Sequence, residues 1–270
     1  MRVPFTKAHG DYNDFLLTWA NEVETKDLAA VARAICDRHA GVGADGWILV
    51  SPAPRGGADY DGSIRLFNSD GSEAELSGNG TRCAAAFLID AGLARETIRI
   101  LTGAGLKQLR LIEFEGLRFS FEMNMGRPRW TAGDLRYPLP LAGGSREVAI
   151  LDVGNPQCAV PVENFDFDWR ALGAEIEGHP HFPARTNVSF FRCPDRHTLE
   201  ARFYERGAGE TMSSGTGSTG AAAAAILLGM AESPVQVHTA AGVLTLRWEG
   251  EEIFLAGPAR IVAGGEYYLQ

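Results

Sequence analysis

Two short segments combine a hydroxyl side chain with a glycine-rich turn and an alanine-rich stretch. Ser77-Gly78-Asn79-Gly80 and Ser214-Gly215-Thr216-Gly217 align without a gap at an offset of 137 residues. Each segment is expected to open a helix, whose first N–H groups have no partner inside the helix and carry a partial positive charge. Glycines let a ligand approach that backbone closely. Each segment therefore predicts a site for a carboxylate or phosphate.

Two such segments facing one ligand would place a serine on each side of it. Ser77 and Ser214 could then serve a racemisation, in which one residue removes an α-proton and the other delivers a proton to the opposite face. The alternative is that both are ordinary helix N-caps, for which serine is favoured. A serine hydroxyl also needs an adjacent base to act on such a proton, and neither loop supplies an obvious one.

The elements that must position these serines recur at the same offset. Arg65, Phe67 and Glu73 align with Arg202, Tyr204 and Glu210, so the 270-residue chain is about twice one unit. Helices are expected at Leu28–Arg38, Gly80–Ala91, Trp169–Ile176 and Gly217–Met230. Alternating patterns separated by turn residues predict strands in largely antiparallel pairing. These strands are Phe15–Thr18, Trp47–Ser51, Ser63–Asn68, Thr97–Thr102, Gln108–Glu113, Leu117–Met123, Val148–Val153, Asn187–Arg192, Thr198–Tyr204, Val235–Thr239, Val243–Trp248 and Glu252–Ala256.

Strand-rich halves with one long apolar helix each predict an α+β fold. Glycine and proline interrupt the pattern at 126–129 and 133–134, so a boundary is expected near residues 115–135. We expect an N-terminal half of residues 1–117, completed by 258–270, and a C-terminal half of residues 118–257.

Composition excludes several classes of protein. The chain is 45% hydrophobic and 22% charged with a net charge of −9, which is typical of a soluble globular protein and argues against a nucleic-acid partner. The longest apolar run, Gly220–Ala231, is too short to span a membrane. The N-terminus is polar within five residues, which argues against a signal peptide, so a cytoplasmic location is expected.

The sequence contains no convincing metal-binding or nucleotide-binding motif. Gly41–Gly46 fits the spacing of a dinucleotide-binding turn but runs from a helix to a strand, the reverse of the required order. His179-Pro180-His181 lacks a third ligand at motif spacing, and the four cysteines show no paired spacing. We expect no metal site.

Several stretches, in order, resemble the diaminopimelate epimerase family. They are Lys7–Phe15, Cys36–Gly46, Phe67–Glu75, Gly78–Cys83, Gly154–Pro156, Thr186–Val188 and Tyr204–Thr211. The resemblance implies a cofactor-independent enzyme that inverts one α-carbon of diaminopimelate in lysine and cell-wall biosynthesis. It implies two pseudo-symmetric halves, each a mostly antiparallel sheet wrapped around a central helix, with the active site in the cleft between them. A small amino-acid substrate and a homodimer are the expected partners.

The sequence departs from the family pattern at the positions that carry the chemistry. The family has cysteine where this chain has Ser77 and Ser214, and histidine where it has Gln157, while the supporting carboxylate Glu205 is kept. A thiol is far more readily ionised beside a helix N-terminus than a hydroxyl is. Three explanations stay open: replacement in the laboratory, a natural branch with altered chemistry or substrate, and a binding protein that has lost catalysis.

The resemblance assigns a role to each matching position. Ser77, Ser214, Glu205 and Gln157 fall on catalytic positions. The substrate α-carboxylate would meet the N–H groups of Gly78, Asn79, Gly215 and Thr216. The rest of the substrate would be recognised by Asn13, Gly46, Asn68, Asn155, Asn187, Glu205 and Arg206. For any single asparagine a turn or cap is the alternative. A pyridoxal phosphate mechanism needs a Schiff-base lysine, and none of the three lysines lies in a suitable loop.

Overall fold

The computed structural model describes residues 1–54, 56 and 58–269. The chain divides into two compact units. Unit 1 comprises Met1–Met123 together with the segment from Gly257 to the C-terminus, and unit 2 comprises Asn124–Ala256. Two strands, β8 (Arg118–Gly126) and β17 (Glu252–Tyr268), contribute residues to both units. Each unit is described below by itself.

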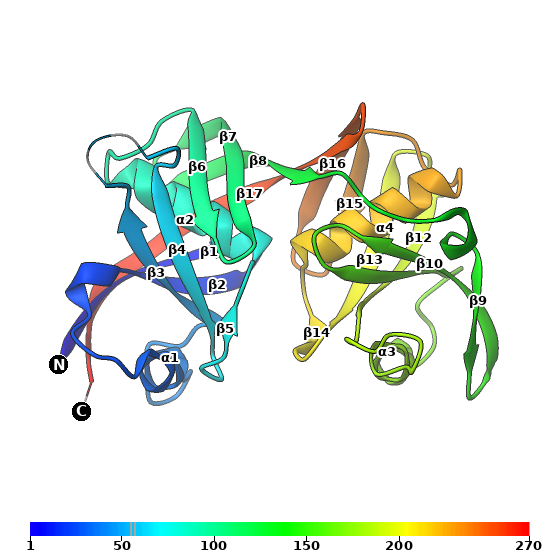
Figure 1. Ribbon diagram of the computed structural model, residues 1–270, viewed down its shortest axis with the longest axis horizontal. Coiled ribbons are helices and arrows are strands. Elements are labelled where there is room, and N and C mark those ends of the chain that lie inside the picture. The colour runs from blue at the N-terminus through cyan, green and yellow to red at the C-terminus, as the bar shows by residue number, and fades with distance from the viewer. Residues whose placement is uncertain (55, 57, 270) are drawn as a thin grey trace. The chain divides into compact units, whose positions relative to one another are not determined.

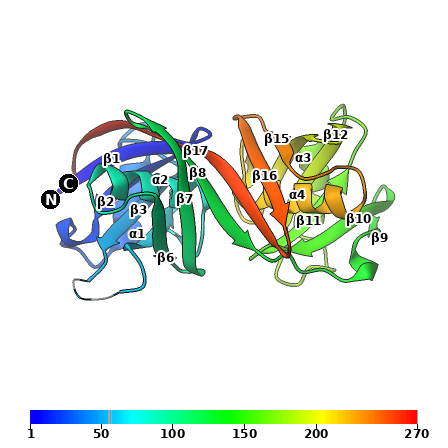
Figure 2. The same cartoon turned by 90° about the horizontal axis from the view of Figure 1, so that it is seen from above.

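Unit 1 is a sheet that closes around one helix. Its strands are β1 (Arg2–Gly10), β2 (Asn13–Trp19), β3 (Gly46–Pro52), β4 (Gly62–Asn68), β5 (Glu73–Ala74), β6 (Thr97–Thr102) and β7 (Gly105–Glu115), with β8 and β17. Pairing runs from β1 through β2, β3, β4, β6, β7 and β8 to β17, which returns to β1. Helix α2 (Gly78–Asp90) lies among these strands in Figures 1 and 2.

Unit 2 repeats this plan. Its strands are β9 (Tyr137–Leu141), β10 (Gly144–Asp152), β11 (Pro156–Pro161), β12 (Asn187–Asp195), β13 (Thr198–Glu205), β14 (Gly209–Thr211), β15 (Val235–His238) and β16 (Val243–Glu249). They pack around α4 (Gly215–Leu227), shown in orange in Figure 1. Helix α1 (Leu28–Cys36) packs on β3 and β4, as α3 (Trp169–Glu177) does on β12 and β13. Single 3-10 turns occur at η1 (Ala20–Glu22) and η2 (Ala132–Asp134).

The two central helices are buried on every side rather than along one stripe. Residues 78–88 of α2 and 215–225 of α4 are all buried. Small side chains make up residues 215–225 of α4 and, apart from Asn79 and Arg82, residues 78–86 of α2, because only small side chains let strands approach a helix from all directions. A helix that is buried all round needs no polar face. Apolar clusters around Trp47 in unit 1 and around Phe190 in unit 2 fill the space between the sheets and the outer helices.

The strand prediction from sequence is incomplete in two respects. β1, β5, β9, β11 and β14 were not predicted, and β11 begins and ends with proline, which conceals it in the sequence. Four pairings are parallel, namely β2–β3, β4–β6, β11–β12 and β13–β15, so pairing is less uniformly antiparallel than expected. No helix in the described ranges is long and apolar enough to cross a membrane.

The starts of the central helices also differ from the prediction. Both helices begin two residues earlier than expected, at Gly78 and Gly215 instead of Gly80 and Gly217. The reason is that each serine caps its helix directly, so that the glycine-rich turn forms the first helical turn and not a loop before it. The backbone N–H groups of both segments therefore belong to the helix termini.

Candidate active site

The first element of the candidate site in unit 1 is the N-terminus of α2. Ser77 has extended backbone, with φ −130° and ψ 123°, and its Oγ accepts a hydrogen bond from the N–H of Gly80 at 3.1 Å. The Ser77 carbonyl oxygen accepts the N–H of Thr81 at 2.8 Å. Ser77 is thus a helix N-cap, which satisfies one of the unpaired donors of the first turn.

The N-terminus of α4 in unit 2 is built in the same way. Ser214 has φ −138° and ψ 122°, and its Oγ accepts the N–H of Gly217 at 3.0 Å. The first turns are tight, since a Cβ on Gly217 would lie 2.7 Å from the Phe203 ring and 2.9 Å from Ser214 Oγ. Both serines are therefore helix N-caps. Each oxygen accepts the capping hydrogen bond, so each hydroxyl proton stays available for a further partner.

Ser214 has such a partner, and it is a carboxylate. Ser214 Oγ donates to Glu205 Oε2 at 3.0 Å, while Thr211 Oγ1 donates to Glu205 Oε1 at 2.6 Å. The β13–β14 hairpin makes this contact, because Glu205 ends β13 and pairs with Gly209 at the start of β14. Burial raises the pKa of Glu205 above its ordinary value, and the two hydroxyl donors only partly oppose that rise. The loop around Ser214 itself supplies no base; the carboxylate that Ser214 contacts is Glu205, the position that the family resemblance gives as the supporting carboxylate.

The corresponding position in unit 1 carries an amide instead. At the offset of 137 residues Glu205 aligns with Asn68, which ends β4 as Glu205 ends β13. Asn68 is exposed, and its Nδ2 donates to Ser72 Oγ at 2.9 Å. Among the described residues of unit 1, no carboxylate lies within hydrogen-bonding distance of Ser77 Oγ. The two capped serines therefore share their backbone setting and differ in their chemistry.

In unit 1 the structure brings Asn13 and Asn79 into contact. Asn79 Nδ2 donates to Asn13 Oδ1 at 3.2 Å, and Asn13 Nδ2 donates to Asp45 Oδ2 at 2.8 Å. Asn13 follows the tight β1–β2 turn, in which Asp11 and Tyr12 both have positive φ, a pattern that suits a two-residue hairpin. Asn13 is half-buried and Asn79 is buried, so Asn13 is the member with access to solvent.

In unit 2 Asn155, Gln157 and Thr216 form a second chain of hydrogen bonds. Gln157 Nε2 donates to Asn155 Oδ1 at 2.7 Å, and Asn155 Nδ2 donates to Thr216 Oγ1 at 3.2 Å. Gln157 is fully buried, and its side chain lies where a Cβ on Gly220 would come within 2.9 Å. Gln157 has no hydrogen bond to Ser214, so within this unit it orients Asn155 and does not assist the serine directly.

The remaining predicted binding positions divide between the two units. Asn187 Oδ1 accepts the backbone N–H of Arg206 at 3.0 Å, and Asn187 Nδ2 donates to the Pro156 carbonyl at 3.0 Å, so this amide holds β11 and β13 together. Arg206 is exposed. Gly46 is buried, and a Cβ there would lie 2.8 Å from the Phe67 carbonyl, which is a packing reason for glycine at this position.

Other motifs from the sequence have structural roles. His179 Nε2 lies 2.8 Å from the Pro140 carbonyl, and His181 stacks on Tyr137. Gly41–Gly46 links α1 to β3, in the helix-to-strand order that argued against a dinucleotide turn. In the part of the chain that the structure describes, no three His, Cys, Asp or Glu side chains are grouped so as to hold a metal ion.

Sequence reasoning missed three residues that contact the site. Thr211 binds Glu205, and Arg82 donates from Nη2 to Asn79 Oδ1 at 2.5 Å. Asp11 lies 3.6 Å from the same Arg82 nitrogen. A signal for Arg82 was present, because it is the one charged side chain in the buried stretch 78–88 of α2, and a buried charge must have a partner.

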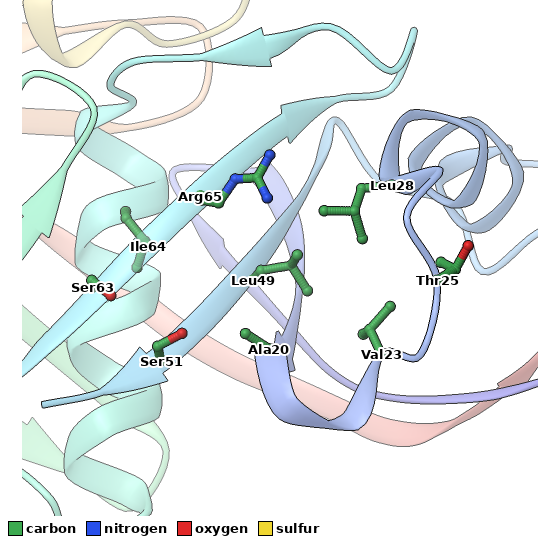
Figure 3. A pocket seen from close by; sticks show the side chains of 9 residues that line it. All are labelled: Ala20, Val23, Thr25, Leu28, Leu49, Ser51, Ser63, Ile64 and Arg65. Carbon is green, nitrogen blue, oxygen red and sulfur yellow. The ribbon is translucent and has the colours of Figure 1, made fainter. Parts of the chain in front are cut away.

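A separate cavity lies elsewhere in unit 1. It measures about 270 Å³ and is lined by residues of η1, α1, β3 and β4. Figure 3 shows Leu28 and Leu49 extending toward the same space, with Ser51 and Ser63 at one end. Arg65 at its rim is already paired with Glu73 through two hydrogen bonds. The cavity shares no residue with the groups around Ser77 and Asn13, so it is not the predicted site.

Comparison with solved structures concerns the fold. A phenazine biosynthesis protein of the PhzF family from Bacillus anthracis superposes with a TM-score of 0.74 at 17% identity, over 100% of both chains. A hydroxyproline epimerase from Agrobacterium vitis gives 0.71 at 14% identity, over 98% of this chain and 92% of that one. At these identities the likeness concerns the fold alone.

Sequence comparison identifies the family. The diaminopimelate epimerase family pattern matches residues 5–131 and 149–262. The diaminopimelate epimerase of Pelotomaculum thermopropionicum is 40% identical, covering 97% of this chain and 98% of the relative. That of Ectopseudomonas mendocina is 39% identical over the full length of both. The chain belongs to the diaminopimelate epimerase family and is a cofactor-independent amino-acid epimerase, an isomerase.

Proposed function

We propose that this protein epimerises an α-carbon of diaminopimelate and that Ser214, activated by Glu205, is one of its two acid/base positions. The observation that carries the proposal is the hydrogen bond from Ser214 Oγ to Glu205 Oε2 at the N-terminus of α4. The choice of diaminopimelate as substrate rests on the relatives, since two full-length relatives are diaminopimelate epimerases. Assignment of the remaining roles rests on the positions that match the family.

The first proton transfer would use both members of the pair. Ser214 Oγ takes the α-proton while its own proton passes to the Glu205 carboxylate, so the serine stays neutral and Glu205 becomes protonated. A buried carboxylate with a raised pKa is a stronger base than an exposed one. Glu205 would be the adjacent base that a serine hydroxyl needs in order to act on an α-proton.

The negative charge left on the substrate needs stabilisation at its α-carboxylate. The first turns of α2 and α4 supply backbone N–H groups at Gly78, Asn79, Gly215 and Thr216, where a helix terminus favours an anion. The second proton would come from the Ser77 hydroxyl; the alkoxide left on Ser77 would then take a proton from water, and the hydroxide so formed would be neutralised by the proton that Glu205 releases. Arg206, exposed and able to bind a carboxylate in bidentate fashion, would hold the distal carboxylate.

The other predicted binding residues complete the proposal. Asn13, Asn68, Asn155 and Asn187 would contribute to recognition of the amino and carboxylate groups, directly or by orienting neighbours. The small amino acid is the partner that the family establishes. The cytoplasmic location and the homodimer stay predictions, and sedimentation velocity of the purified protein tests the latter.

The decisive experiment follows deuterium from D2O into the α-carbon of diaminopimelate. It compares the parent chain with the Ser77→Cys/Ser214→Cys variant by NMR. Exchange by both supports catalysis by the serines. Exchange by the double variant alone means that the serines block an otherwise intact epimerase. Exchange by neither variant contradicts the choice of substrate.

One observation favours a second candidate, a binding protein for an amino dicarboxylate. Ser77 lacks a bonded carboxylate among the described residues of its unit, so a two-sided reaction has only one activated side. This candidate predicts that diaminopimelate binds in calorimetry without any deuterium entering the α-carbon. It is excluded if exchange by the parent chain depends on Glu205.

A further inference from the structure

Arg82 is the buried cation of unit 1, and its surroundings are unusual. It lies within α2 with no solvent exposure. Its Nε donates to the Pro258 carbonyl at 3.1 Å and its Nη2 donates to Asn79 Oδ1 at 2.5 Å. Gly10 makes this packing possible, since a Cβ there would lie 3.1 Å from the Pro258 carbonyl and 3.3 Å from Arg82 Nη2. A buried arginine is costly unless its donors are used.

The hydrogen bonds from Arg82 continue to Asn13. Arg82 donates to Asn79, Asn79 donates to Asn13, and Asn13 donates to Asp45 at its Oδ2 atom. Asp45 is itself paired with Arg38, whose Nη2 lies 2.7 Å from Asp45 Oδ1. The chain therefore starts at a guanidinium, which can only donate, and ends at an ion-paired carboxylate, which accepts.

Fixed ends determine the direction of both amides between them. Oxygen and nitrogen of an asparagine side chain are distinguished by the network in which they lie. With Arg82 as donor, Asn79 must present its oxygen to it and its NH2 group to Asn13. Asn13 then accepts through its oxygen and directs its NH2 group toward Asp45. Each NH2 group has two protons and uses one in this chain, so Asn13, the half-buried member, keeps an N–H for a ligand.

We infer that Arg82 is a positioning residue that sets the direction of the Asn79 and Asn13 carboxamides. Its role for the ligand rests on the proposed function, since the half-buried Asn13 is there assigned to substrate recognition. An N–H at this point suits a carboxylate, whereas a flipped amide would present an oxygen and repel it. Arg82 acts from within the helix and through two other side chains.

The test compares a variant that removes the donor with one that keeps it. Arg82→Met is combined with Asp11→Asn so that no lone carboxylate is left buried beside the vacated position. Arg82→Lys retains a donor-only side chain. Thr18→Val is the matched control, because it removes a buried hydroxyl of unit 1 that bonds Pro4 and Trp47 and takes no part in the chain.

The first readout is spectroscopic and needs no ligand. In 15N-labelled protein, we expect the Asn13 and Asn79 NH2 signals to shift in Arg82→Met/Asp11→Asn and their exchange with solvent to accelerate about tenfold, as for a lost hydrogen bond. In Arg82→Lys and Thr18→Val the signals and their protection should persist. Unchanged signals in the double variant overturn the inference, and so does an equal loss in Thr18→Val.

The second readout is the Kd of diaminopimelate by calorimetry. We expect it to rise about tenfold in the double variant and to stay at the parental value in Thr18→Val. A structural role alone would lower the fraction of folded protein equally in both and leave Kd unchanged, which would overturn the inference. Absence of binding to the parent chain would contradict the proposed function instead, and the NMR comparison would still decide the role of Arg82.

Discussion

The two units place a serine in the same backbone setting and give it different neighbours. Ser77 and Ser214 cap helices of equal length, and their oxygens accept N–H groups at 3.1 and 3.0 Å. Beyond the cap the units diverge, because the end of β13 carries Glu205 and the end of β4 carries Asn68. The repeat thus preserves the capped helix start, the proposed anion site, and varies the residue at the strand end, the proposed proton acceptor in unit 2.

The hydrogen-bonded chains of amide side chains also differ between the units: the chain with charged groups lies in unit 1, whereas the carboxylate beside the serine lies in unit 2. In unit 1 the chain to Asn13 is held between Arg82 and Asp45, two charged groups. In unit 2 the chain from Gln157 to Thr216 has no charged end. Among the described residues, Gln157 Oε1 is buried without a hydrogen-bond partner, as Arg82 Nη1 is in unit 1. Under the proposed function, unit 1 would supply recognition groups of fixed orientation, and unit 2 would supply the acid/base serine that is bonded to a carboxylate.

The largest effect should come from removing the base of unit 2. We expect Glu205→Gln to slow α-proton exchange by about 100-fold or more, the usual contribution of a positioned general base. Glu200→Gln is the matched control, because it changes a carboxylate on the same strand that pairs with Arg192 outside the site. A rate for Glu205→Gln equal to that of the control would remove the chemical difference between the units.

The pH dependence of exchange provides a second check on Glu205. Its pKa is raised by burial, so the parental rate should fall with decreasing pH through a value above that of an ordinary glutamate. Glu205→Gln should lose this limb of the profile, while Glu200→Gln should keep it. A limb that persists in Glu205→Gln would assign the titration to another group.

Cysteine substitution should affect the two units unequally. Ser77→Cys introduces a thiol at a helix N-terminus without a bonded carboxylate, a setting that lowers the pKa of a thiol. Ser214→Cys places the thiol against Glu205, whose negative charge opposes formation of a thiolate. We expect Ser77→Cys to accelerate exchange by about tenfold more than Ser214→Cys. Equal gains, measured by deuterium incorporation at one pH, would mean that Glu205 does not distinguish the two sites.

The sequence predicted the repeated scaffold well because short-range chemistry determines it. Serine followed by Gly-x-Gly and alanines is sufficient to define a capped, buried helix in both units. The strand register repeats as well, because Phe67 pairs with Glu73 in unit 1 as Tyr204 pairs with Glu210 in unit 2. The predicted helix starts lie two residues after the observed ones, because the glycine-rich turn is itself the first helical turn.

The contacts that define the chemistry were not predictable in the same way. Glu205 reaches Ser214 because the β13–β14 hairpin folds back, and that register is not visible in a spacing of nine residues. Gln157 was assigned a catalytic position by resemblance, yet its side chain is directed to Asn155 by packing against Gly220. Arg82 and Asn79 are only three residues apart in α2, but the bond from Arg82 to the Pro258 carbonyl joins residues 176 apart, and no sequence spacing reveals it.

A smaller expected effect is on stability: Asp11 of unit 1 should make the unfolding free energy depend on pH. Burial raises the pKa of Asp11 to about 6, with Arg82 opposing the rise. The folded state therefore retains a proton that the unfolded state has lost, so this group makes the unfolding free energy fall as pH rises from about 4 to about 6 and leaves it level above. The corresponding turn of unit 2 carries Val153 and Gly154 and adds no such contribution.

Replacing this carboxylate should therefore remove a pH-dependent part of the unfolding free energy. The unfolding free energy of the parent should fall between pH 4 and pH 7, and that of Asp11→Asn should not. Relative to the parent, the variant should therefore gain at most about 3 kcal/mol over this range. Loss of the charge partner of Arg82 adds a component that does not vary over this range. Urea unfolding at several pH values measures the difference, and a difference independent of pH would show that Asp11 titrates normally.

The smallest effect separates the cap from the acid/base contact. Ser77→Ala removes one cap, which costs about 1 kcal/mol of unfolding free energy. Ser214→Ala removes an equivalent cap together with the bond to Glu205, so we expect it to cost about 1 kcal/mol more. Asparagine retains the capping oxygen, so Ser77→Asn should restore the parental stability. If the two alanine variants unfold at the same urea concentration, the Ser214–Glu205 bond adds nothing to folding, and its retention would be explained by the reaction alone.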